Sequence, residues 1–176
     1  MRYPVTGLIF FVVFAGCVHL NTDTPRFEDP EIAMVLRVAN LSEVREGELA
    51  REKAAEPSVR DFAAMMVNEH SAADSTEESA FFKANIVSDD SPLSRQLDAE
   101  SGAATERLRA LTGRAFDRAY TQRQIEAHQN LLHLIDAKLM PAAHHKVVKE
   151  QLKTLRKSAQ QHLTRAEQVV KTIPAS

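Results

Sequence analysis

Four polar residues interrupt the apolar stripes of four predicted helices, and all four have side chains that bind metals. They are Glu43, His70, His128 and His162. Neutral imidazole and carboxylate groups suit zinc, copper and iron. Each residue lies near or somewhat past the middle of its helix, and the middles of neighbouring helices share one layer of a bundle. The pattern therefore predicts a site for one transition-metal ion, iron, copper or zinc, inside the bundle.

The inward direction of these side chains follows from their spacing, because residues three or four positions apart share one face of a helix. His70 comes four residues after the apolar Met66. His128 continues a stripe through Tyr120 and Gln124 in steps of four, so these two residues are candidates to hydrogen-bond a ligand or a bound water. The other two stripes are Leu36, Ala39, Glu43, Glu46 and Ala50, and Leu155, Ala159, His162 and Ala166.

The same residues also fit a structural hypothesis. In it, His70, His128 and His162 hydrogen-bond Glu43 and Tyr120 in a buried polar network that sets the register of the helices, without a metal. Geometry separates the two hypotheses, since metal ligands must converge to within roughly 4 to 5 Å of one another.

Three further histidines are expected at the surface. His133 follows His128 by five residues, roughly 140° around a helix. His144 and His145 are adjacent and do not share a face. The chain has no nucleophile elbow, phosphate loop, CxxC or HExxH pattern, which excludes the enzyme classes that depend on them. Whether the domain is an enzyme stays open, with a non-catalytic role favoured.

Composition predicts an all-α domain. The 176 residues include no Trp and only five Gly, and helix-forming residues are abundant. The formal net charge of −2 gives no basis for binding nucleic acid. Pro and Gly residues divide the chain, with Asp29 expected as the first N-cap and Pro141 expected to end a helix. The expected helices cover about 29–55, 58–84, 91–111, 113–139 and 142–172.

The N-terminus has the order of a secretory signal. A positive Arg2 precedes an apolar run over 7–13, and small residues precede Cys17, the only Cys of the chain. The apolar stretch 5–18 has about 14 residues, fewer than the roughly 20 that span a bilayer. A permanent membrane helix and an ordinary signal peptide with a coincidental Cys are the alternatives.

The segment ending at Cys17 resembles the bacterial lipobox. The resemblance implies a signal peptide over 1–16, a lipidated Cys17 and a flexible tether over 17–28, followed by a domain over 29–173. It also implies a membrane partner, reached through the lipid on Cys17. Val18 in place of Asp favours the periplasmic face of the outer membrane. With a single Cys, the domain contains no internal disulfide.

Longer segments of the chain resemble a bacterial family described as predicted outer membrane proteins of unknown function. The resemblance rests on 40–50, on Met-Val-Asn-Glu-His at 66–70, on Phe-Asp-Arg-Ala-Tyr at 116–120 and on His162. It implies an exported, ferritin-like up-down four-helix bundle, with one extra short helix before the third long one. No His of the bundle has Glu three residues before it, so the carboxylate-bridged di-iron centre of ferritin-like proteins is not expected.

Two functions are compatible with these observations. The first is a lipoprotein that binds a transition metal for metal handling or protection against oxidative stress. The second is a non-enzymatic envelope or stress protein in which the buried His and Glu residues are purely structural and the surface binds another component.

Overall fold

The computed structural model describes residues 27–174, and all regular secondary structure in this range is helical. The predicted signal peptide, Cys17 and the tether up to residue 26 lie outside the described residues. None of the helices within 27–174 is both long and apolar enough to cross a bilayer. The elements are α1 (Asp29–Lys53), α2 (Pro57–Lys83), α3 (Pro92–Arg109), α4 (Gly113–Leu134), a π-helical turn (Ile135–Leu139), α5 (Met140–Ala142), α6 (Lys146–Val169) and a 3-10 turn (Val170–Thr172).

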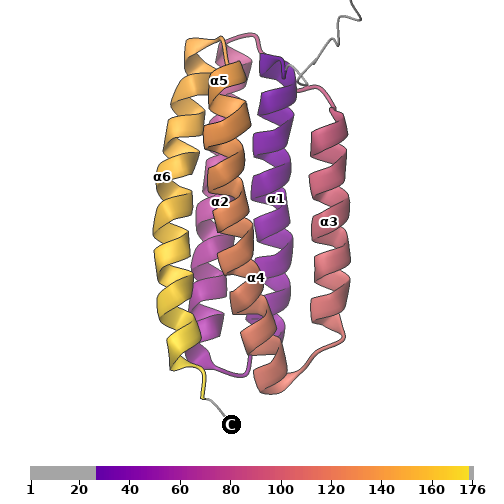
Figure 1. Ribbon diagram of the computed structural model, residues 1–176, viewed down its shortest axis with the longest axis vertical. Coiled ribbons are helices and arrows are strands. Elements are labelled where there is room, and N and C mark those ends of the chain that lie inside the picture. Colours follow the sequence, from indigo (N-terminus) through magenta and orange to yellow (C-terminus); the bar gives the residue numbers. More distant parts are fainter. Residues whose placement is uncertain (1–26, 175–176) are drawn as a thin grey trace, which may run out of the picture.

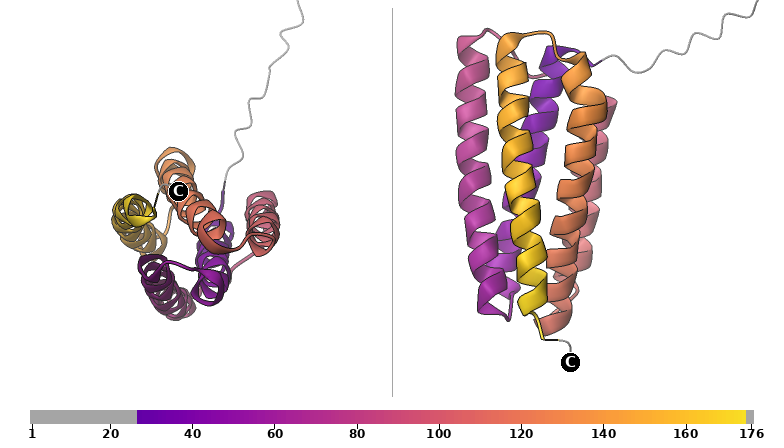
Figure 2. Two further views of the ribbon diagram at one scale, coloured as in Figure 1. Left: turned by 90° about the horizontal axis from the view of Figure 1, so that it is seen from below. Right: turned by 60° about the vertical axis from the view of Figure 1, so that its left-hand side comes forward.

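The helices form an elongated bundle in which consecutive long helices run in opposite directions (Figure 1). Helix α1 packs along α2, and α4 packs along α6. Contacts between α2 and α6 and between α1 and α4 complete the bundle, whereas α3 lies outside it, mainly against α1 (Figure 2). The all-α prediction is confirmed.

The bundle has an apolar core at each end and a polar layer between them. In α1, Leu36 belongs to one core cluster and Leu49 to the other. Between these two residues, Asn40, Glu43 and Glu46 are buried. The buried polar residues at the corresponding positions of the other long helices are His70, Gln124, His128 and His162. Burial of this many polar groups in one layer is costly unless each has a partner.

The start of α1 differs from the prediction, because Glu28 is the N-cap and not Asp29. The backbone N–H of Glu28 donates to the Glu31 carboxylate over 3.0 Å. The Asp29 carboxylate instead accepts the backbone N–H groups of His144 and His145, at 2.9 and 2.8 Å. Asp29 therefore ties the start of the domain to the loop that precedes α6.

The helix that was expected to end at Pro141 continues through it to Ala142. Before the proline, the N–H of Met140 donates to the carbonyl of Ile135, five residues earlier. After it, the N–H of Ala143 donates to Leu139, four residues earlier. Pro141 lacks an N–H and sits where this register changes. Helix α6 accordingly begins later than predicted, at Lys146, with the His145 ring accepting the N–H of Val147.

Candidate metal centre

Three histidines from three helices meet in the polar layer. His70 lies on α2, His128 on α4 and His162 on α6, and these residues are 2%, 0% and 3% exposed. One nitrogen from each ring lies within 4.8 Å of the others. The ring centroids are 4.9 to 6.1 Å apart. Helical spacing alone predicted that these side chains face inward.

Each ring is held from outside by one hydrogen bond to an oxygen that can only accept. His70 Nδ1 donates to Asn40 Oδ1 over 2.9 Å. His128 Nδ1 donates to the Gln124 carbonyl over 2.8 Å. His162 Nε2 donates to Glu69 Oε2 over 2.8 Å. These bonds place the proton on the outer nitrogen of each neutral ring, so the inner nitrogen carries a lone pair.

The inner nitrogens are His70 Nε2, His128 Nε2 and His162 Nδ1, and all three are buried without a hydrogen-bond partner among the described residues. Leaving a buried acceptor unpaired costs about 1 to 3 kcal/mol. Three such atoms in one place therefore call for a common occupant. Metal-binding histidines have this arrangement, with the outer N–H bonded to a carboxylate or carbonyl and the inner nitrogen directed at the metal.

Burial keeps the three imidazoles neutral. Burial, with smaller contributions from His162 and His128, lowers the pKa of His70 to about 2. It lowers the pKa of His128 to about 4, against the opposing hydrogen bond to the Gln124 carbonyl. It also lowers the pKa of His162, although the bond to Glu69 acts in the other direction. Neutral imidazole is the form that binds a metal.

The spacing of the nitrogens suits one ion after a small contraction. A metal about 2.0 to 2.1 Å from each nitrogen in tetrahedral geometry sets nitrogen separations of about 3.4 Å. One nitrogen from each ring now lies within 4.8 Å of the others, so binding requires the rings to move closer by about 1 Å.

The structure does not place Glu43 in this group of nitrogens. Glu43 is buried on α1, and its Oε2 has no partner among the described residues. Burial raises the pKa of this carboxyl group, while Arg123 and Gln124 oppose the shift. Tyr120 is fully buried against Phe62 and Phe116, and its hydroxyl is also unpaired within residues 27–174.

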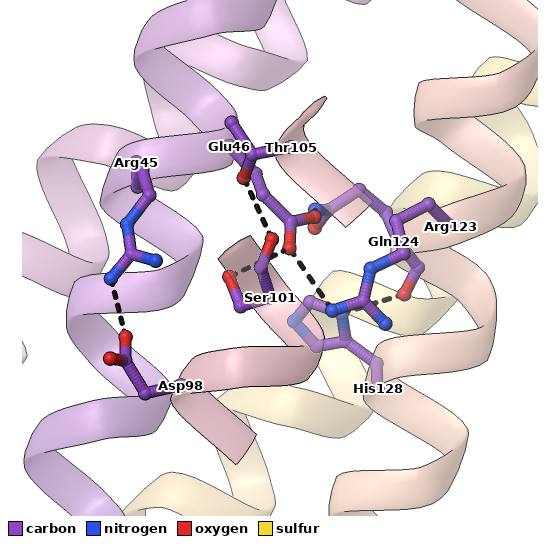
Figure 3. Close-up of polar contacts among 8 residues, drawn as sticks. All are labelled: Arg45, Glu46, Asp98, Ser101, Thr105, Arg123, Gln124 and His128. Carbon is purple, nitrogen blue, oxygen red and sulfur yellow. Dashed lines mark hydrogen bonds and ion pairs between the residues drawn. The ribbon is translucent and has the colours of Figure 1, made fainter. Parts of the chain in front are cut away.

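A second polar cluster joins α1, α3 and α4 beside the histidines (Figure 3). Glu46, which is fully buried, accepts hydrogen bonds from Arg123 at 3.0 Å and from Ser101 at 3.1 Å. Its second oxygen accepts from the Gln124 side chain at 3.3 Å. The backbone carbonyl of Gln124 accepts the hydrogen bond from His128 Nδ1, and the predicted role of Gln124 beside a ligand stays a prediction. Its side chain belongs to the Glu46 cluster.

Sequence reasoning missed the residues that hold the rings. Asn40 connects His70 to Glu77, because its amide group donates to Glu77 Oε2 over 2.8 Å and accepts from His70. A signal for Asn40 was available, since it lies four residues after Leu36 on an apolar face. Glu69 occurs in the family motif at 66–70, but it is half exposed and its spacing gives no such signal.

The other three histidines match their prediction. His133, His144 and His145 are exposed. They supply matched controls for substitutions in the buried cluster.

Comparison with solved structures supports the all-helical fold. The crystal structure of a DUF305 protein from Streptomyces coelicolor, described as a secreted protein, superimposes with a TM-score of 0.67 and 14% sequence identity. The match covers 81% of this chain and 91% of that protein. Among curated proteins, none matches the chain. A family model matches residues 19–169, so the chain belongs to the family described as "Domain of unknown function (DUF4142)".

Proposed function

We propose that this domain binds one transition-metal ion through His70 Nε2, His128 Nε2 and His162 Nδ1. One observation carries the proposal: three buried histidine rings each offer a nitrogen within 4.8 Å of the others, and each ring has one nitrogen bonded to an acceptor and one without a partner among the described residues. An ion at their centre gives every one of these lone pairs a partner. It also explains why so polar a layer lies between two apolar cores.

The structural hypothesis accounts less well for these contacts. It predicts hydrogen bonds from the histidines to Glu43 and Tyr120. Within residues 27–174, the three rings instead bond to Asn40, Gln124 and Glu69, and Glu43 Oε2 and the Tyr120 hydroxyl have no partner. A network kept only for stability is expected to satisfy its own buried atoms.

The donor set favours copper or zinc over iron. Three neutral imidazoles suit all three metals, but affinity generally rises from iron(II) to copper(II) and falls again at zinc(II). The histidines lack the Glu-x-x-His pairs of di-iron carboxylate proteins. We propose a ligand set of three histidines in place of the four residues predicted from the sequence. In this proposal Glu43 lies beside the metal without binding it.

The setting that we propose is a lipoprotein on the periplasmic face of the outer membrane, anchored through Cys17. The four long helices support a ferritin-like bundle, and a secreted protein of similar fold supports export. In that setting the centre serves metal handling or protection against oxidative stress.

Metal titration tests the proposal. The protein, purified without a histidine tag, is stripped of metal and titrated with copper(II), zinc(II) and iron(II) by equilibrium dialysis. We expect one equivalent to bind, with copper tightest, and His70→Ala/His128→Ala to lose it. The control His133→Ala changes an exposed ring and should bind as the wild type does. Equal binding by the double variant, or none by the wild type, would overturn the proposal.

A further inference from the structure

We propose that the metal keeps an open coordination position on the side of Glu43, and that a small molecule able to donate a hydrogen bond reaches it through the cavity between α1, α3 and α4. This inference rests on the metal centre proposed above. It concerns what the centre binds in addition to the protein and from which side that molecule enters.

The larger pocket beside the histidines lies behind the rings. It has a volume of about 300 Å³ between α1, α2 and α6, and its walls include Asn40, Glu69, His70 and His162. Asn40 and Glu69 accept the outer N–H groups of these two rings. The inner nitrogens therefore point away from this pocket, and a molecule in it would meet the hydrogen-bonded edges of the rings and not the metal.

The smaller cavity lies on the other side of α1. It has a volume of about 110 Å³, and its walls include Ser42, Glu43, Ser101, Arg123 and Ala127. Ala127 directly precedes His128 on α4, and Glu43 lies close enough to His162 to influence its pKa. Through these two residues the cavity adjoins the polar layer that holds the inner nitrogens.

The cavity contains unused hydrogen-bonding atoms. Ser42 Oγ, Glu43 Oε2 and Arg123 Nε are buried without partners among the described residues. Glu43 and Ser42 are 7% and 8% exposed, so bulk water does not compensate them. A guest molecule here meets an acceptor on Glu43, a donor on Arg123 and a hydroxyl group that can act either way.

Size and hydrogen bonding define the class of guest. A cavity of about 150 Å³ accommodates benzene, so about 110 Å³ admits a molecule of roughly four heavy atoms. Arg123 already pairs with Glu46, whereas Glu43 Oε2 has no partner within residues 27–174. The guest is therefore a small molecule with a hydrogen for Glu43 and a lone pair for the metal, such as water, a peroxide or a simple amide.

Water itself is the first probe. The copper(II)-loaded protein is measured by water-proton relaxation, which increases when a metal-bound water exchanges with the solvent. Ala127→Leu fills the small cavity and should reduce the relaxation enhancement by more than half, whereas Ala73→Leu fills the larger pocket and should leave it unchanged. Ala39→Leu fills the small cavity from the opposite wall and replaces Ala127→Leu if that variant loses copper.

Formamide and acetonitrile then test the hydrogen bond to Glu43, because both are neutral molecules of three heavy atoms with a lone pair and only formamide has N–H groups. We expect formamide to displace the water at a concentration at least about tenfold lower than acetonitrile, since acetonitrile leaves the buried Glu43 Oε2 without a partner. Equal or stronger competition by acetonitrile would overturn the hydrogen bond to Glu43. A lower enhancement in Ala73→Leu with an unchanged one in Ala127→Leu would overturn the route.

Failure of the two proposals can be told apart. A wild type that binds no copper contradicts the metal centre. A wild type that binds one copper without any enhancement of water relaxation contradicts only the open position.

Discussion

Replacement of His128 by Leu distinguishes a metal ligand from a structural histidine. His128 is fully buried, and its Nε2 has no partner among the described residues. Such an unpaired atom costs about 1 to 3 kcal/mol. Leu has a similar volume and no polar atom, and the Gln124 carbonyl keeps the backbone N–H of residue 128 as its α-helical donor. Without metal, we expect His128→Leu to be as stable as the wild type or more stable by about 1 to 3 kcal/mol.

Addition of metal should make the wild type more stable than His128→Leu. At a free metal concentration 100 times the Kd, binding stabilises the wild type by about 2.7 kcal/mol, whereas the variant gains nothing. Urea denaturation followed by circular dichroism measures the free energy of unfolding of both proteins, first with EDTA and then with copper or zinc. His133→Leu, at an exposed position, controls for the loss of an imidazole. The reasoning is refuted if His128→Leu is less stable in EDTA by about 1 kcal/mol or more, the cost of one lost hydrogen bond, and metal does not stabilise the wild type.

Three further predictions concern the surroundings of the centre. Asn40→Ala frees the His70 ring and should weaken metal binding about 10- to 100-fold with little change in helicity, and unchanged affinity in dialysis would contradict this. Burial raises the pKa of Glu77 from 4.5 to about 8, so its stabilising contribution is present below pH 4.5 and is lost as the pH rises to about 8. Glu77→Gln should therefore gain up to about 4 kcal/mol in urea denaturation at pH 8 and little at pH 4, whereas an equal gain at both pH values argues against a titrating group. A Cβ at Gly47 would lie 2.8 Å from Val67 Cγ2. Overpacking of this kind costs about 1 to 3 kcal/mol, which exceeds the roughly 1 kcal/mol by which Ala stabilises a helix relative to Gly. Gly47→Ala should therefore lower the thermal stability. A melting temperature at or above that of the wild type would show that α1 and α2 separate easily.

The convergence of the three histidines was predictable because it depends on local rules. A spacing of three and four residues identifies the inner face of each helix. The similar depth of His70, His128 and His162 follows from their positions near the middles of long helices of similar length. Helix lengths and spacings within a helix can both be read from a single sequence.

The rest of the site depends on how the helices are rotated against each other. On α1, Asn40 and Glu43 are three residues apart, about 60° around the helix, and only packing decides which of them meets His70. The same holds for Glu69, which reaches His162 across 93 positions of the chain. The helix around Pro141 was not predicted for a different reason. A proline usually ends a helix, but here a change of hydrogen-bond register lets the helix continue through it. The lipid anchor on Cys17 stays a prediction.

X-ray absorption spectroscopy of the protein with one equivalent of copper or zinc tests the metal centre most directly. The account predicts three imidazole nitrogens at about 2.0 to 2.1 Å with one further oxygen or nitrogen ligand, and loss of the imidazole signal in His70→Ala/His128→Ala. A shell of oxygen atoms alone, or a spectrum that the double variant leaves unchanged, would contradict it.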